Sequence, residues 1–471
     1  MILRSGSWPV RSLHVPPITH APRYPHITSH LSISLHHHVI MTSQIERLPV
    51  ELFELVAASL ELLSCKNLRL TSQRLRFLIH PLFVECAFSR LKTTLGSPSL
   101  GRLVNVSRCE NLRGAVKVLQ IQLLTSSDYH TLAAISRVGR FPPPKRFPRV
   151  PGIQDRHVHD EATTLKYVLE SSYPTRLYDS LVKALRGFTN LEAVHFYPRN
   201  DQPAACRRLI SEDDRLFRSR CFQVVVDAIV QTDVRLLEFR MAKCRRGTAL
   251  HKEATLPFSV LNVPAQSLHA LCHRFSHLHT LTISVLTIYD DVSQVPGWQK
   301  WIASIVATAP KLRNLTLSLD RSAYVASAFR SLASSCTCPN LQVFQLMFCA
   351  LHADDLASMI SSHSATLRRA LFSDLRLVTG TWSSILHALK ECKKLEHLRL
   401  SSLSEENHPI QRLDVRRENR DMAGMLEEII AIYDTPADTL APENSSSVGP
   451  HHVVGLSVNL RERLNITVPS G

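Results

Sequence analysis

Apolar triplets of the form L-x-x-L-x-L recur along this chain and restrict its architecture more than any other feature. Each triplet alternates its apolar side chains toward one face, as a β-strand does. The first residues of the last seven triplets lie 45, 42, 34, 29, 26 and 28 residues apart. Self-similarity at a converging period predicts stacked repeats. The triplets are Val116-Leu119-Ile121, Leu191-Val194-Phe196, Leu236-Phe239-Met241, Leu278-Leu281-Ile283, Leu312-Leu315-Leu317, Leu341-Phe344-Leu346, Leu367-Ala370-Phe372 and Leu395-Leu398-Leu400.

Amphipathic stretches separate these triplets, at residues 181–188, 222–230, 298–306 and 382–389, and their apolar spacing predicts helices. Strands that alternate with helices and run in the same sense form right-handed crossovers. The predicted fold is therefore α/β, with parallel strands on the concave side of a curved solenoid and helices outside. The later spacings resemble those of leucine-rich repeats. The pattern fails after some triplets, at Asp320, Leu375 and Leu403, so we expect irregular repeats.

Residues 45–91 carry a different pattern, that of short amphipathic helices. Pro49 suits the first turn of a helix over Leu52–Leu60. Ser64 suits the N-cap of a second helix, either Thr71 or Ser72 suits that of a third, and Pro81 is expected to end the third. Fewer than fifty residues of helix cannot hide so many leucines internally, so a hydrophobic face should remain for a partner.

Three blocks of this segment resemble the F-box family, with degenerate leucine-rich repeats following as in fungal-type members. The blocks are Leu48-Pro49-Val50-Glu51-Leu52, the stretch Asn67–Leu75, and Pro81-Leu82-Phe83. The resemblance implies a three-helix F-box that docks on a Skp-type adaptor and, through it, on a cullin ubiquitin ligase. Ser64-Cys65 departs from the family's usual Asp-Leu pair. The implied adaptor-binding residues are Leu48, Pro49, Leu52, Val56, Leu60, Leu68 and Leu75.

The competing interpretation of each of these leucines is a core position inside the module, above all for Leu68 and Leu75. In the favoured interpretation the chain is the substrate-recognition subunit of a Skp–cullin–F-box ligase, whose repeats bind an unidentified protein substrate. The alternative is a leucine-rich interaction scaffold that recruits no ligase, with the helices capping the solenoid.

The expected organisation has six parts, each bounded by a change in composition. Residues 1–40 lack Asp and Glu and hold several prolines and seven histidines, so we expect them to be disordered, with Met41 as the true start. The remaining parts are an F-box-like module at 41–90, a connecting helix and possible first repeat at 91–138, a Pro-rich loop at 139–161, the solenoid at 162–403, and a tail at 404–471 with one helix over 421–433 and a strand pair over 453–468.

The net charge of +15 raises the possibility of a nucleic-acid partner. Lys and Arg are, however, spread along the chain, and the denser stretches at 199–220 and 240–252 hold one aromatic residue, Phe217, where base stacking needs an interleaved series. We therefore expect a solvated basic surface. No apolar run is long enough to cross a bilayer, and a soluble cytoplasmic or nuclear protein is expected.

Catalytic and metal motifs are weak. The chain has no GxSxG elbow, phosphate-binding glycine loop or HExxH, so we expect neither an enzyme nor a cofactor. His269, His273 and His277 stand four residues apart beside Cys272, which would align three imidazoles on one helix. We expect them to be exposed and unliganded, since no acidic partner is evident. The eleven cysteines are scattered, with Cys336-Thr337-Cys338 the closest pair, and are interpreted as buried thiols in a reducing compartment.

Overall fold

A computed structural model describes the chain at residues 44–123, 164, 166–198, 212–241, 256–261, 263–286, 298–319, 323–336, 338–405, 415–418 and 422–434. Three of the expected segments lie outside these residues. They are the N-terminal extension, the Pro-rich loop at 139–161 and the strand pair over 453–468. Asp320, one of the positions where the repeat pattern fails, also lies outside them.

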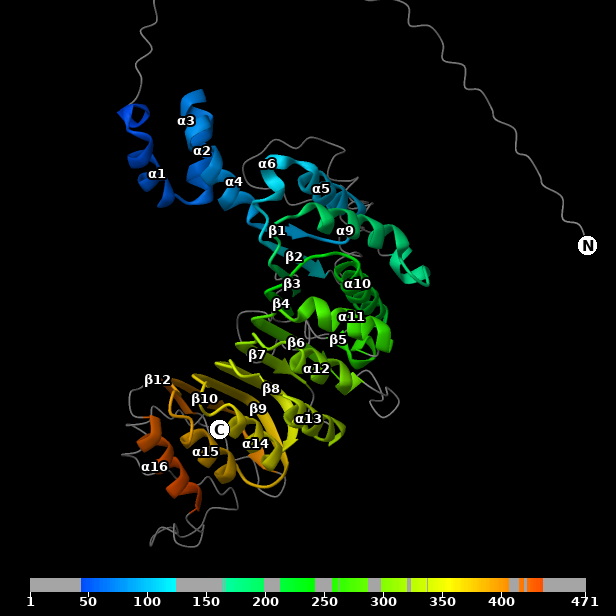
Figure 1. Ribbon diagram of the computed structural model, residues 1–471, viewed down its shortest axis with the longest axis vertical. Coiled ribbons are helices and arrows are strands. Elements are labelled where there is room, and N and C mark those ends of the chain that lie inside the picture. The colour runs from blue at the N-terminus through cyan, green and yellow to red at the C-terminus, as the bar shows by residue number, and fades with distance from the viewer. Residues whose placement is uncertain are drawn as a thin grey trace, which may run out of the picture.

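Helices and strands alternate along the described chain (Figure 1). The helices are η1 Gln44–Arg47, α1 Val50–Ala58, α2 Leu62–Thr71, α3 Gln73–Leu78, α4 His80–Phe88, α5 Ser97–Arg108, α6 Glu110–Arg113, α9 Thr175–Gly187, α10 Glu212–Val230, η2 Phe258–Leu261, α11 Ala265–Phe275, α12 Trp298–Ala307, α13 Ala323–Ser335, α14 Ala353–Ser362, α15 Trp382–Lys390 and α16 Met422–Asp434. The strands are β1 Arg90–Thr93, β2 Val118–Leu123, β3 Ala193–Pro198, β4 Glu238–Met241, β5 Leu256–Pro257, β6 Thr280–Leu286, β7 Asn314–Ser318, β8 Val343–His352, β9 Arg369–Thr379, β10 His397–Ser401, β11 Ser404–Glu405 and β12 Val415–Glu418.

One sheet runs through the whole body in the order β1-β2-β3-β4-β6-β7-β8-β9-β10-β12. Its neighbours from β1 to β10 pair in parallel, which confirms the predicted α/β fold with a parallel sheet. Figure 1 shows the strands stacked along one side of an arc and the helices α9 to α15 along the other. The middle residues of all eight predicted triplets share one row of the sheet, Leu119, Val194, Phe239, Leu281, Leu315, Phe344, Ala370 and Leu398.

The long interval between the first two triplets does not interrupt the sheet. Leu119 of β2 lies directly opposite Val194 of β3, although 75 residues separate them in the sequence. The sheet also begins one strand earlier than expected, because Arg90–Thr93 pairs with β2 as β1. The helix α5 packs behind these strands, where the sequence predicted a connecting helix.

Two separate hydrophobic cores are present in the described chain. The larger runs without a break from Leu95 to Ile430 and fills the space between the sheet and the helices. The smaller belongs to the helices α1 to α4 and consists of Phe53, Ala57, Cys65, Leu75 and Ile79 with partly buried neighbours. The N-terminal helices, residues 44–88, are called the helical module below.

The position eight residues after the first residue of each triplet, where leucine-rich repeats usually carry Asn or Cys, is apolar at Leu375 and Leu403. Cys349, Leu375 and Leu403 each follow the first residue of their triplet by eight positions, and all three side chains are fully buried. The Cys349 thiol donates a hydrogen bond to the carbonyl of Ala350 at 3.3 Å, a polar contact that leucine lacks. In the repeats with Leu375 and Leu403, this position is therefore stabilised by apolar packing without that hydrogen bond.

The residue before that position has a left-handed backbone in three successive repeats. The φ angles of Phe348, Asp374 and Ser402 are 50°, 57° and 54°. This conformation places Cβ close to the carbonyl oxygen and costs a non-glycine residue about 1–2 kcal/mol. The kink recurs at the same repeat position, so the repeat itself imposes it, and the gain from burying the next side chain offsets its cost.

Branching at Cβ should be poorly tolerated at this kink. Ser402→Val is expected to lower the free energy of unfolding by about 1–2 kcal/mol, because a β-branched side chain fits the left-handed region worst. Ser402→Gly removes the backbone cost and is expected to be neutral or stabilising. Urea unfolding of both variants checks this, and equal stabilities for valine and glycine would contradict it.

The tail ends the sheet in a way that the sequence did not predict. The strand β12 pairs with β10 in antiparallel orientation, with Leu398 opposite Arg417. The helix α16, found where a helix was expected, buries Met425, Leu426 and Ile429 against the main core. A salt bridge of 2.8 Å joins its Glu427 to Lys390 of α15.

Candidate functional site

The helical module folds through short caps and one shared core. Pro49 precedes α1, and the carbonyl oxygen of Pro49 accepts the first helical hydrogen bond from Phe53 at 2.9 Å. Phe53 and Ala57, four residues apart, form the buried stripe of α1. The hydroxyl of Ser72, one of the two residues predicted for this cap, accepts a hydrogen bond from the backbone N–H of Leu75 at 3.1 Å and caps α3.

The helix boundaries of this segment differ from the prediction at two positions. Ser64 does not cap α2 but lies inside it, because α2 begins at Leu62 with Glu61 at the N-cap position. Pro81 does not end α3; it occupies the first turn of a fourth helix, α4, where its missing N–H is not needed. The segment therefore holds four α-helices instead of the three expected.

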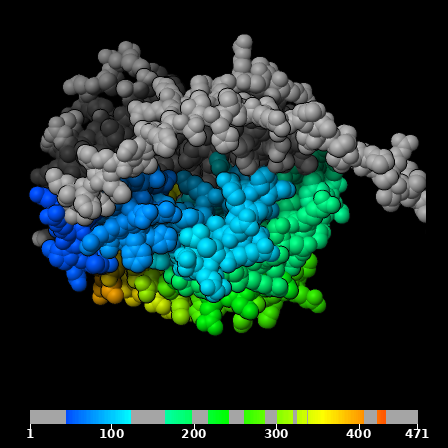
Figure 2. Space-filling model, turned by 90° about the horizontal axis from the view of Figure 1, so that it is seen from above, coloured from blue at the N-terminus to red at the C-terminus, as the bar shows by residue number. Residues whose placement is uncertain are grey.

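Exposed apolar side chains are concentrated on this module. In the described part of the chain, eight of the nine large apolar residues that face solvent lie between positions 50 and 77. The ninth is Leu216 of α10. Figure 2 shows the module, in blue, at one end of the visible face beside the cyan residues of α5 and α6. The eight residues, called the apolar surface below, are Val50, Leu52, Leu55, Val56, Leu62, Leu63, Leu70 and Phe77.

The predicted adaptor-binding residues divide into two groups. Leu52 and Val56 belong to the apolar surface, with exposed fractions of 50% and 47%, and Pro49 is exposed beside them. Leu75 is buried in the module core, and Leu48, Leu60 and Leu68 pack against that core half-buried. For Leu75 the structure favours the core interpretation. The predicted set therefore contains both residues exposed to a partner and residues that belong to the module core.

The most exposed members of the apolar surface are absent from the predicted set. Leu70 at the end of α2 is 85% exposed and Phe77 on α3 is 81% exposed, and Leu55 on α1 is 71% exposed. The spacing of α1 could have revealed Leu55, because Leu52, Leu55 and Val56 form one helical stripe next to the buried Phe53 and Ala57. Nothing in the sequence distinguishes Phe77 from the buried Phe53.

Charges around the apolar surface are segregated. Glu51, Glu54 and Glu61 lie exposed on α1 and just before α2. Exposed basic residues follow on α2 and α3, at Lys66, Arg74 and Arg76. An apolar centre with a charged rim is the arrangement of protein interfaces, in which the rim directs orientation and the centre supplies most of the affinity.

No family model matches this chain, and no curated protein does. Function is therefore inferred from the surfaces of the molecule. Among the described residues, no helix is both long enough and apolar enough to span a bilayer.

The residues between the core positions of each strand form a second candidate surface on the sheet, although three of them, Gln120, His195 and Thr282, are buried. One row of the register carries mostly polar side chains, some joined to a neighbour, such as Thr316 to Gln345 at 3.4 Å. His195 of β3 contacts Glu238 of β4 at 2.6 Å, and Arg240 pairs with the same carboxylate. The row is Lys92, Gln120, His195, Arg240, Thr282, Thr316, Gln345, Leu371 and Arg399.

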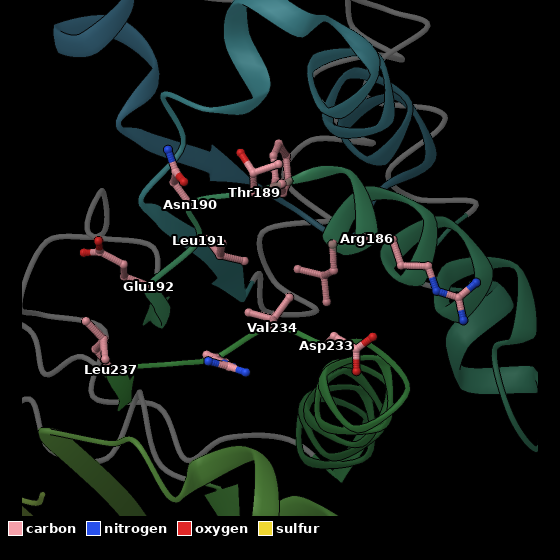
Figure 3. Close-up of a pocket in the computed structure, with 11 residues that line it drawn as sticks. Arg186, Thr189, Asn190, Leu191, Glu192, Asp233, Val234 and Leu237 are labelled. Carbon is pink, nitrogen blue, oxygen red and sulfur yellow. The ribbon is translucent and has the colours of Figure 1, made fainter.

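A pocket of about 450 Å³ lies where α9 and α10 turn into β3 and β4 (Figure 3). Arg186 and Asp233 border it from the helix side, and Glu192 and Leu237 border it near the strands. Its lining includes no Ser, Cys, His or Lys. The pocket also lies at the amino ends of the strands, whereas open parallel sheets bind ligands beyond the carboxyl ends. Neither the lining of this pocket nor its position at the sheet therefore indicates a catalytic site.

The histidine series before β6 does not share one helical face. The helix α11 ends at Phe275, so His277 lies beyond it, with its Nδ1 3.5 Å from Nζ of Lys311. His269 and His273 are exposed, as expected, while Cys272 is buried in the core. No group of metal-binding geometry occurs among the described His, Cys, Asp and Glu residues.

Proposed function

We propose that this chain is the substrate-recognition subunit of a Skp–cullin–F-box ubiquitin ligase. The apolar surface of the helical module carries the proposal, because eight of the nine exposed large apolar residues of the described chain gather on so short a segment. Burying one such side chain is worth about 1.5–3 kcal/mol. Leaving eight in water is a cost that an adaptor interface removes.

The parallel sheet supports the other part of this proposed role, the recognition of a protein substrate. It presents the polar row from Lys92 to Arg399 across nine parallel strands. The row's members Lys92, Arg240, Thr316, Gln345 and Arg399 are at least partly exposed, and such polar side chains on a rigid sheet suit recognition of a protein substrate. Holding substrate and ligase together raises the effective concentration of substrate lysines, so the chain needs no catalytic residue of its own. Such a subunit works in the cytoplasm or nucleus.

Co-expression of the full chain with a Skp-type adaptor, followed by size-exclusion chromatography, tests the proposal. The wild-type chain is expected to co-elute with the adaptor. Leu52→Asp is expected to weaken binding by about 10- to 100-fold, because losing about 1.5–3 kcal/mol of burial corresponds to that range. Leu52 is half exposed, so its replacement should leave the module folded.

Leu216→Asp is the matched control. It makes the same chemical change at another exposed leucine, 40% exposed on α10 in the solenoid, and should bind the adaptor as the wild type does. Circular dichroism confirms that both variants fold. The proposal fails if the wild-type chain does not bind, or if both variants lose binding equally.

A non-ligase scaffold is the second candidate, and the junction between α4 and β1 favours it. The carbonyl oxygen of Ser89 accepts hydrogen bonds from the backbone N–H groups of Lys117 and Val118, at 3.0 and 2.8 Å. Lys117 also pairs with Glu85 of α4 at 3.3 Å. The module is thus joined to the first edge of the sheet, as a capping unit would be. A wild-type chain that folds but does not bind the adaptor would support the role of a non-ligase scaffold.

A further inference from the structure

Two cysteines and a histidine meet in the interior of the solenoid, away from the surfaces described above. Cys336 follows α13, Cys338 lies in the approach to β8, and His363 caps the C-terminal end of α14. The two Sγ atoms are 3.8 Å apart, and Nε2 of His363 is 3.8 Å from Sγ of Cys336. All three residues are buried.

The tautomer of His363 directs its reactive nitrogen at Cys336. Its Nδ1 lies 2.7 Å from the carbonyl oxygen of Met359, which only accepts, so Nδ1 carries a proton. Nε2 is then the atom that takes a proton from the Cys336 thiol or, once protonated, stabilises the thiolate. A thiol with a histidine base is the arrangement that activates cysteine nucleophiles.

The contacts within the cluster shift the pKa values of the two thiols in opposite directions. The hydrogen bond with Cys338, and after it the contact with His363, lowers the pKa of the Cys336 thiol in spite of the opposing effect of burial. The hydrogen bond with Cys336, together with burial, raises the pKa of the Cys338 thiol. Burial alone would lower the pKa of His363, but the Cys336 contact raises it above the usual value. The pKa shifts of the two thiols thus have opposite directions and favour ionisation of Cys336 over that of Cys338.

We propose that Cys336, Cys338 and His363 form a redox-modification site, at which a small hydroperoxide converts the two thiols into a reversible disulfide. Metal binding fits the residues less well, because no described group has metal-binding geometry. Closing the bond requires the sulfur atoms to approach from 3.8 Å to about 2.05 Å. A bridge across two positions closes a small ring and constrains little chain, so it is suited to reversible use.

The chemistry proceeds in two balanced steps. The Cys336 thiolate attacks one peroxide oxygen; an S–O bond forms, the O–O bond breaks, and the alcohol leaves after taking a proton, giving a sulfenic acid. Cys338 then loses its proton and attacks the Cys336 sulfur; an S–S bond forms, the S–O bond breaks, and water leaves. Two thiols and one hydroperoxide become one disulfide, one alcohol and one water. A dithiol reductant reverses the change by thiol–disulfide exchange.

Cys392 provides a control inside the same molecule. Cys336 and Cys392 have the same exposed fraction, 4%, so an oxidant has equal access to both by this measure. Burial, and then the charge of Glu391, raises the pKa of the Cys392 thiol to about 11, and its Sγ donates a hydrogen bond to the carbonyl oxygen of Ala388 at 3.4 Å. Any difference in oxidation rate between the two thiols therefore reflects the cluster around Cys336.

The experiment exposes the full-length reduced protein to a small molar excess of hydrogen peroxide and follows each cysteine by differential alkylation and peptide mass spectrometry. Cys336 and Cys338 are expected to disappear together, more than about tenfold faster than Cys392, and to return on treatment with dithiothreitol. Cys338→Ser should stop the reaction at a Cys336 sulfenic acid that dimedone traps. His363→Gln should slow the first step.

Three results would overturn the proposal. They are oxidation of Cys336 no faster than that of Cys392, oxidation of Cys336 and Cys338 without a linked peptide, and linkage of Cys336 to a different cysteine. Because all three are read on the wild-type protein, the test remains decisive if a variant fails to fold.

Discussion

Replacing Phe239 with alanine is expected to lower the free energy of unfolding by about 3–5 kcal/mol. The Phe239 side chain on β4 is fully buried among three other rings, with centroid distances of 5.0 Å to Phe275, 5.7 Å to Phe196 and 6.2 Å to Phe222. Phe196 comes from the neighbouring strand β3, Phe222 from α10 and Phe275 from α11. Truncation removes the transfer energy of one ring and leaves a cavity that three rigid neighbours cannot fill.

The damage should be local as well as large. Each repeat of a solenoid contacts chiefly its neighbours, so loss of the Phe239 cluster should weaken β3, β4 and β6 before β9 and β10. Hydrogen exchange read by mass spectrometry distinguishes the two regions, and urea unfolding gives the total change. Leu216→Ala, at an exposed site, serves as the control and should change stability by less than about 0.5 kcal/mol. Uniform loss of protection along the sheet would contradict the expected nearest-neighbour behaviour.

The double replacement Leu55→Asp with Phe77→Asp is expected to reduce adaptor affinity by about 10²- to 10⁴-fold. Burial of each side chain at an interface is worth about 1.5–3 kcal/mol, and the two losses together span that range. The residues lie on α1 and α3 and are 71% and 81% exposed, so neither substitution disturbs the module core. Isothermal titration of the purified adaptor into each variant measures the change.

Each single variant shows which helix contributes. If Leu55→Asp weakens binding and Phe77→Asp does not, the adaptor contacts α1 and leaves the α3 side for another partner. Glu54→Gln, on α1 between the apolar positions, is the control for a local change and should shift affinity by less than about threefold, as rim charges do. A double variant that binds as the wild type does would remove the apolar surface from the proposed function.

The sheet could be predicted from the sequence because burial alone determines it. Every strand of the eight triplets places its middle residue in the core, and the period brings those residues into one row, as Leu281 and Leu315 illustrate. The strand β1 was missed because Arg90–Thr93 is short and mostly polar. The strand β12, Val415–Glu418, was missed because its sequence has little apolar pattern and it joins the sheet by pairing with β10.

The sites were less predictable because they depend on exposure and on contacts across repeats. Leu75 and Leu52 have the same side chain in the same module, yet packing of α3 buries one and leaves the other half exposed. Cys336 and His363 are 27 residues apart, close to one repeat period, and only the stacking of α13 and α14 brings them together. The Cys-x-Cys spacing was visible in the sequence, whereas its histidine partner was not.

The direction of β12 affects whether a second copy of the chain could extend the sheet at this edge. A parallel array that ended on β10 would present an edge on which the first strand of a second copy could continue the same sense, and head-to-tail contacts of that kind lead to open filaments. Because β12 runs antiparallel to β10, the last edge has the opposite polarity. An incoming copy would meet a strand running the wrong way for its own repeat. Among the described strands, the polarity of β12 therefore disfavours head-to-tail extension of the parallel array by a second copy.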